Sequence, residues 1–97
     1  LYNNLKDFTK LVHILANKFN TTTLNVAEQF NSQIAKKYTE LVELAINFIQ
    51  MYGKESYLFN EWIKDGLDVN ATINNDNTSL LMYAAFYGNT QVVKLLL

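Results

Sequence analysis

The chain has 97 residues, a hydrophobic fraction of 49%, a formal net charge of −1 and no cysteine. This length suffices for one small domain with a packed core, and the absence of cysteine excludes disulfides and cysteine-ligated metal sites. A net charge of −1 gives no strongly basic surface to attract nucleic acid. Because all basic residues are lysine, no guanidinium group is available to bind phosphate or guanine either. No segment approaches the roughly 20 apolar residues of a membrane-spanning helix.

The apolar spacing at the start of the chain predicts an amphipathic helix over residues 3–19. Apolar residues recur there at steps of three and four, which places them on one helix face. They are Leu5, Phe8, Val12, Leu15 and Phe19. Residues 20–23 interrupt this pattern. A second helix is predicted to start at Asn25, because Glu28 three positions later completes a pair similar to a capping box.

Beyond Asn25 a single apolar stripe continues to Tyr52. Its members are Val26, Phe30, Ile34, Tyr38, Leu41, Ala45, Phe48 and Tyr52. The spacing permits one long helix to about Tyr52, and Thr39-Glu40 could equally begin a separate helix. The sequence leaves this choice open, although two helices would better suit a helix pair beginning at residue 40.

Three short helices are predicted in the remainder of the chain. Ser56 is a predicted N-cap for a helix over residues 57–64, and Gly66 stands just beyond its end, where glycine often terminates helices. Residues 67–78 are rich in Asn, Asp and Thr and predict a turn or hairpin finger. Helices over 80–87 and 90–97 follow, with Gly88 and Asn89 between them.

The C-terminal sequence resembles the ankyrin repeat family. Residues 79–85 (SLLMYAA), Gly88 and residues 92–97 (VVKLLL) follow the closing segment 68–70 (DVN). They match the family's T-P-L-H-x-A-A start, its V-V-x-L-L-L second helix and its D-V-N closure. Leu80 stands where the family has proline and Met82 where it has histidine. These departures remove a preset backbone angle and a side-chain hydrogen bond between repeats.

An earlier, incomplete copy precedes this repeat. Its second helix is carried by Leu58, Phe59, Trp62 and Ile63, and residues 64–70 (KDGLDVN) close it. Leu58 lies 34 positions before Val92, close to the family period of about 33. Glu61 takes a position that is usually apolar, and Trp62 is predicted to lie in the core.

The resemblance implies an all-α, ankyrin-type helical solenoid fragment. We expect a non-ankyrin N-terminal helical cap over residues 1–39, followed by ankyrin repeats over 40–97. The first repeat, over 40–70, is degenerate; the second, over 71–97, is truncated. Because residues 92–97 lack a closing segment and a polar outer face, we expect the natural chain to continue.

Candidate catalytic and metal-binding residues are sparse. His13 is the only histidine, so we interpret it as a partly exposed helix residue rather than a zinc ligand or a catalytic base. Glu40 and Glu43 could share a helix face but are interpreted as surface charges. No EF-hand spacing relates the three candidate calcium ligands, Asp65, Asp68 and Asp76. The sequence therefore predicts no enzyme activity, no cofactor and no metal.

The resemblance implies a protein-interaction module, because such repeats bind folded partners through their fingers and first helices. The two positions after A-A commonly face the partner in this family, and aromatic side chains there suit binding. In the finger, we expect Ile73 to be an exposed aliphatic side chain at the loop tip. The protein-binding candidates are Ile73, Asn75, Asp76, Thr78, Phe86 and Tyr87.

Two alternative functions stay open. The fragment could target a larger enzyme or secreted effector whose catalytic domain lies outside these residues. It could also be a structural or oligomerising domain, in which the stripe from Val26 to Tyr52 pairs with a second copy, although a homo-oligomer is not predicted. The absence of cysteine favours the cytoplasm, while secretion as an effector stays open. The identity of the protein partner is not predicted.

Overall fold

The computed structural model describes residues 4–51, 56–74 and 77–97. The helices are α1 (Leu5–Lys18), α2 (Thr23–Glu28), α3 (Gln33–Gln50), α4 (Ser56–Lys64), α5 (Leu80–Phe86) and α6 (Thr90–Leu96). The described residues form no strand, and one isolated antiparallel bridge joins Thr72 to Ser79. The predicted all-α class is therefore confirmed.

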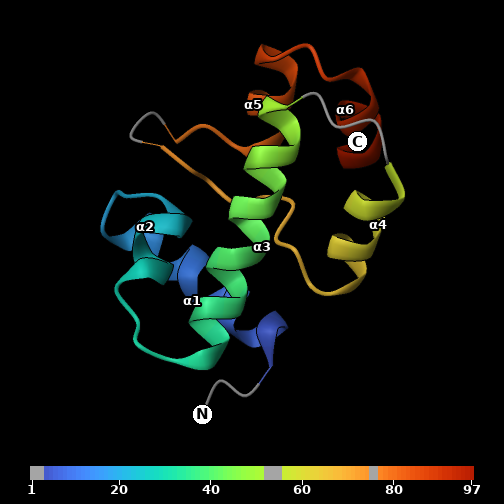
Figure 1. Cartoon of the computed structure of the whole chain (residues 1–97). Helices are drawn as coiled ribbons and strands as arrows, with labels where there is room; N and C mark the ends of the chain where they lie inside the picture. Colours follow the sequence, from blue (N-terminus) through green and yellow to red (C-terminus); the bar gives the residue numbers. More distant parts are fainter. Residues whose placement is uncertain (1–3, 52–55, 75–76) are drawn as a thin grey trace.

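Four helices form two stacked pairs. α3 packs against α4 in the first pair, and α5 packs against α6 in the second. Between the pairs, α3 contacts α5 and α4 contacts α6, so each helix lies beside its counterpart. In Figure 1, α3 runs through the centre of the molecule, with α4 and α6 on one side. Each pair buries its apolar face against the other pair, which is the packing of a helical solenoid.

The front of the stack is formed by α1 and α2, which pack against each other and against α3. Phe8 of α1 is buried, and its ring makes edge contacts with Phe30 and Tyr38 at centroid distances of 5.4 and 5.7 Å. The predicted boundary between residues 39 and 40 lies inside α3, which is continuous over 33–50. The first helix of the first pair is therefore shared with the front of the molecule.

The start of α2 differs from the prediction. The hydroxyl of Thr22 accepts the backbone N–H of Asn25 at 3.0 Å, so the helix begins at Thr23 and Thr22 is its N-cap. The predicted capping pair of Asn25 and Glu28 is wrong. The side-chain amide of Asn25 instead donates to the hydroxyl of Thr21 at 2.8 Å.

Neither of the two helix arrangements left open for residues 25–52 is formed. α2 ends at Glu28, and α3 begins at Gln33, where the hydroxyl of Ser32 accepts the backbone N–H of Ala35. The cap at Ser32 interrupts the apolar stripe before the expected break at Thr39-Glu40, because the serine hydroxyl satisfies one of the free N–H groups at the start of a new helix there. Tyr52 lies outside the described residues.

The remaining helices agree with the prediction within one or two residues. Ser79 caps α5 by accepting the N–H of Met82 at 3.2 Å. Ser56 is the first residue of α4 rather than its cap. Gly66 has a φ of +107°, and a Cβ atom there would lie 2.6 Å from a side-chain carbon of Leu5. Glycine is therefore required at this position by the backbone angle and by the close approach of α1.

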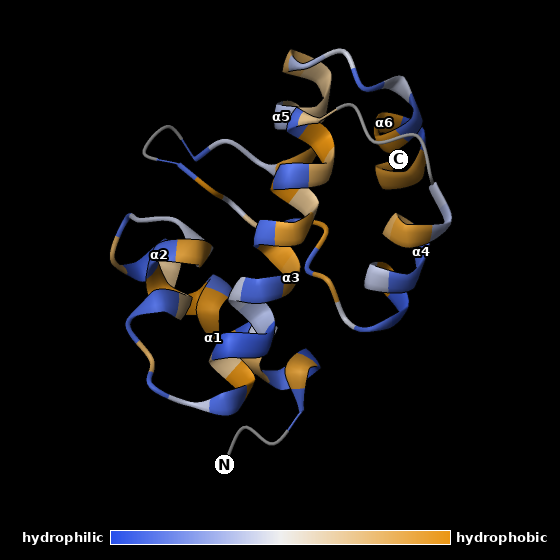
Figure 2. Cartoon of the chain, in the orientation of Figure 1, coloured by the Kyte–Doolittle hydropathy of each residue, from blue (hydrophilic) through white to orange (hydrophobic). Residues whose placement is uncertain are grey.

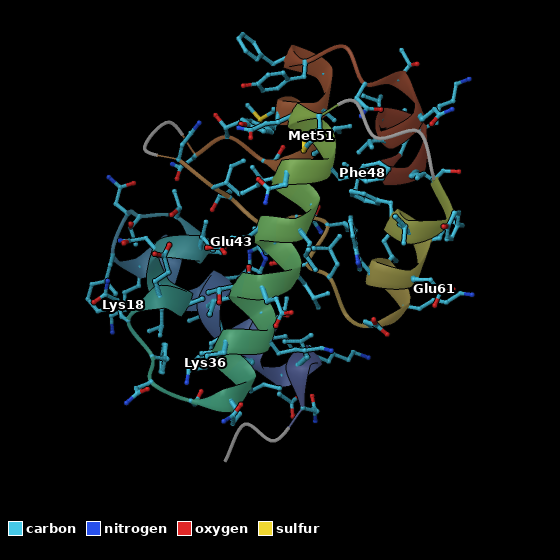
Figure 3. All side chains as sticks on the ribbon, viewed as in Figure 1. Lys18, Lys36, Glu43, Phe48, Met51 and Glu61 are labelled. Atoms are coloured by element: carbon cyan, nitrogen blue, oxygen red, sulfur yellow. The ribbon has the colours of Figure 1, made fainter. Side chains whose placement is uncertain are left out.

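The core continues through the front and the stacked pairs. Phe59 of α4 is fully buried, and Trp62, predicted to be core, is half-buried against it. The Trp62 ring lies 5.5 Å from the ring of Phe48 and 5.9 Å from that of Phe59. Phe48 points from α3 toward α4 in Figure 3, and Figure 2 shows hydrophobic residues in both α4 and α6. This aromatic cluster joins α3 to α4.

Candidate protein-interaction surface

The exposed side of α5 carries four large side chains, Met82, Tyr83, Phe86 and Tyr87, which we call the aromatic face. Phe86 is 83% exposed and Met82 is 54% exposed. The half-buried ring of Tyr87 contacts the rings of Tyr83 and Phe86 at centroid distances of 4.9 and 5.3 Å. Phe86 is therefore exposed to solvent while the edge of one ring packs against the face of the other in its contact with Tyr87.

The end of α3 adjoins the aromatic face. The side-chain amide of Gln50 donates a hydrogen bond to the hydroxyl of Tyr83. The next residue, Met51, is 81% exposed, and Figure 3 shows it at the end of α3 that lies near α5. Residues 44–51 and 77–93 contain no Lys, Arg, Asp or Glu. Partial burial, and then the hydrogen bond with Tyr87, raise the pKa of Tyr83 above its ordinary value, so its phenol stays protonated at neutral pH. Together with the absence of charged residues, this leaves the surface uncharged.

The finger, which we define as residues 70–79, forms the predicted hairpin. Ile73 donates its backbone N–H to the carbonyl of Thr78 at 2.9 Å, and Asn77 donates to the carbonyl of Asn74 at 2.9 Å. Ile73 was expected at the exposed tip, and this expectation is wrong. Its pairing with Thr78 places it on the stem of the hairpin, where its side chain is partly buried and packs against the core. Removing this aliphatic side chain from water is favourable.

The predicted binding residues lie on two elements. Phe86 and Tyr87 belong to the end of α5, while Ile73 and Thr78 belong to the stem of the finger. Thr78 is half-buried. The other two candidates, Asn75 and Asp76, lie outside the described residues. Ser79 connects the two elements, because it ends the finger and caps α5.

A buried polar cluster beneath the finger was not predicted. The side chain of Asp68 is 4% exposed. Its Oδ2 atom lies 2.6 Å from Nε2 of His13 and accepts a hydrogen bond from the hydroxyl of Tyr38 at 2.7 Å. Its Oδ1 atom accepts the backbone N–H of Asn70 at 3.0 Å. These three partners offset the desolvation of the carboxylate.

The sequence carries little signal for this cluster. His13 and Asp68 are 55 positions apart, and Tyr38 and Asp68 are 30 positions apart. His13 was interpreted as a partly exposed helix residue, and its side chain is indeed 38% exposed. Its pairing with Asp68 could be found only once α1 had been placed beside the closing segment of the first repeat.

Thr23 extends the cluster toward the finger. The hydroxyl oxygens of Tyr38 and Thr23 lie 2.9 Å apart. The single hydroxyl proton of Tyr38 goes to the carboxylate of Asp68, because an ionised acceptor forms the stronger hydrogen bond. The hydroxyl of Thr23 in turn accepts the backbone N–H of Thr72 at 2.9 Å. The cluster therefore links α1, α2 and α3 to the finger.

Alkaline pH should weaken the fold through Tyr38. Burial, and then the carboxylate of Asp68, raise the pKa of Tyr38 above its ordinary value. The folded state then holds the phenol proton more tightly than the unfolded state does. The stabilisation is complete below the unfolded pKa of about 10 and is lost as the pH rises above it. We expect the free energy of unfolding from urea titrations to fall less steeply in Tyr38→Phe than in the wild type between about pH 9 and 11. Equal slopes would contradict this account.

Two surface hollows lie in this part of the molecule. One of about 400 Å³ borders the cluster at His13 and Thr23 and is lined mainly by asparagine and threonine side chains. Another of about 840 Å³ lies between the start of α1 and the start of α3, at Phe8 and Lys36.

Within the described residues, no three His, Cys, Asp or Glu side chains gather as metal ligands would. None of the helices described here is long and apolar enough to cross a membrane.

The fold defines a class of protein, a helical repeat protein in which a hairpin finger connects one stacked helix pair to the next along the chain. Residues 51–97 match the family model for ankyrin repeats (many copies). This match covers 47 of the 97 residues, and it confirms the resemblance of the C-terminal part of the chain to the ankyrin repeat family. No curated protein and no solved structure matches the chain significantly. The family match begins at Met51, immediately after α3, so it does not include α1, α2 or α3.

Proposed function

We propose that this chain is a non-catalytic protein-interaction module that binds its partner through the aromatic face of α5. Ankyrin repeats generally mediate interactions between proteins. The observation that carries the proposal is Phe86, a large aromatic side chain that is 83% exposed and packs on the ring of Tyr87. Aromatic side chains, phenylalanine among them, are enriched in protein–protein interfaces relative to the rest of the protein surface.

The surroundings of Phe86 support an apolar contact. Met51 and Met82 are exposed nearby on α3 and α5, and methionine side chains adapt easily to the shape of a partner. The absence of charged residues from 44–51 and 77–93 means that burying this surface desolvates no ion. Of the finger candidates, Ile73 and Thr78 are partly buried, so we propose that α5 contributes more to binding than the stem of the finger does.

The stripe from Val26 to Tyr52 does not support the oligomerising alternative. Phe30, one of its described members, is 38% exposed, but Val26, Tyr38, Leu41 and Ala45 are at most 7% exposed and belong to the core of the chain itself. This part of the stripe is already covered by intramolecular packing. These four side chains are therefore not available to a second copy of the chain.

Phe86→Ala should abolish partner capture without destabilising the protein. Because the side chain is mostly in water, its removal costs little folding energy, while loss of a binding hot spot weakens a complex by at least about 2 kcal/mol, or about 30-fold. The measurement is capture from cell lysate by immobilised wild type and variant, with quantitative mass spectrometry. Thermal unfolding is recorded for each protein beforehand.

Phe19→Ala is the matched control. Phe19 is 66% exposed but lies at the end of α1, outside the aromatic face. We expect at least one protein to be captured equally by the wild type and Phe19→Ala and to be depleted with Phe86→Ala. If the two variants have the same capture profile as the wild type, the aromatic face is not the binding surface.

A further inference from the structure

The finger of the ankyrin repeat is attached to the first turn of α2. Thr72 donates its backbone N–H to the hydroxyl of Thr23 at 2.9 Å, and the hydroxyl of Thr72 accepts the backbone N–H of Thr23 at 2.8 Å. The carbonyl of Thr72 also accepts the N–H of Leu24 at 3.2 Å. The first N–H groups of a helix have no partner within that helix. Here Thr72 satisfies two of them and is held by Thr23 in return.

The base of the finger is attached to the same helices through Asp68. Its carboxylate contacts His13 of α1 and Tyr38 of α3 while also accepting the N–H of Asn70, where the finger begins. The two attachments are linked through the hydroxyl oxygens of Thr23 and Tyr38, which lie 2.9 Å apart. A continuous hydrogen-bonded connection therefore runs from the front helices to both the base and the stem of the finger.

These attachments matter because the hairpin itself is small. Its described pairing includes the bridge between Thr72 and Ser79 and the hydrogen bonds from Ile73 to Thr78 and from Asn77 to Asn74. A short two-stranded hairpin is only marginally stable in water. External hydrogen bonds at its base and stem can therefore decide whether it stays in one position.

We infer that the helices in front of the ankyrin repeats set the position of the finger, with Thr23 and His13 as its positioning residues. His13, Thr23 and Tyr38 all precede the part of the chain that matches the family, whereas Asp68 and Thr72 lie within it. The front helices thus do more than cover the apolar end of the stack. They hold the finger through side chains that precede the part of the chain that matches the family. This inference does not depend on the proposed function.

Amide hydrogen exchange of the whole chain, followed by NMR, tests the inference. Thr23→Val removes the hydroxyl and nearly keeps the side-chain shape, and Thr23→Ser restores the hydroxyl. We expect the N–H groups of Thr72 and Ile73 to exchange at least about tenfold faster in Thr23→Val and at the wild-type rate in Thr23→Ser, because local opening of the finger exposes them. The N–H of Val93 in α6, which donates to Asn89, serves as the internal reference and should not change.

Asn25→Ala is the matched control within α2, since it removes a side-chain hydrogen bond to Thr21 that does not involve the finger. The inference is overturned if Thr72 and Ile73 keep wild-type exchange in Thr23→Val, if Val93 accelerates equally, or if Thr23→Ser behaves like Thr23→Val. Should Thr23→Val fail to fold, His13→Ala replaces it, because His13 is 38% exposed. That variant should accelerate the exchange of the Asn70 N–H, and unchanged exchange there would refute the role of His13.

Discussion

Asp68→Ala is expected to lower the free energy of unfolding by about 2–4 kcal/mol, because it removes the acceptor shared by three donors. The buried hydroxyl of Tyr38 loses its hydrogen bond to the carboxylate, and so does the N–H of Asn70 in partly buried surroundings. The partly exposed imidazole of His13 can be hydrated again, so its loss adds less. Urea denaturation followed by circular dichroism measures this change.

Asp65→Ala controls for the loss of an aspartate from the same segment. Asp65 lies just after α4 and is exposed. Its carboxylate is close to the negative end of the helix dipole, where a negative charge does not stabilise the helix. Replacing this exposed side chain should therefore change the free energy of unfolding by less than about 0.5 kcal/mol. If Asp68→Ala were as stable as Asp65→Ala, the buried cluster would contribute nothing to stability.

Phe59→Ala is expected to have the largest effect on stability, a loss of about 3–5 kcal/mol. The side chain is fully buried, and its ring contacts those of Phe48 and Trp62 at 5.7 and 5.9 Å. Truncation removes apolar contacts and leaves a cavity between α3 and α4. A small domain typically has only about 5–15 kcal/mol of stability, so a large fraction of it is lost. The melting temperature and the urea midpoint both report the change.

Tyr57→Ala on the same helix distinguishes core packing from a general effect on α4. Tyr57 is 63% exposed, and replacing an aromatic residue by alanine also raises helix propensity. We expect the free energy of unfolding to change by less than about 1 kcal/mol. Equal destabilisation by both substitutions would mean that the aromatic cluster is not what joins α3 to α4.

The helices could be predicted where periodicity and a terminator agree. The apolar spacing of residues 3–19 indicated α1, and Ser79 with Gly88 indicated the two ends of α5. Prediction failed over residues 25–52, where the apolar stripe continues through a break. The hydroxyls of Thr22 and Ser32 determine the boundaries there by capping two separate helices, and competing caps cannot be ranked from spacing alone.

The candidate surface was predicted in part, through the family resemblance. That resemblance pointed to Phe86, whose side chain is exposed, while the exposure expected of Ile73 was wrong. A hairpin pattern indicates that a turn exists but does not tell which residue lies at its tip. Because Ile73 pairs with Thr78 through its backbone, the register of the hairpin decided the environment of Ile73.

The sequence by itself determined the all-α class, the positions of most helices and the ankyrin character of the C-terminal part, because these depend on local spacing and short motifs. Only the tertiary structure decided that His13, Thr23 and Tyr38 would meet Asp68 and Thr72. These contacts join residues 15 to 55 positions apart. Hydrogen bonds of this kind depend on how the helices pack against one another, and no local pattern in the sequence records them.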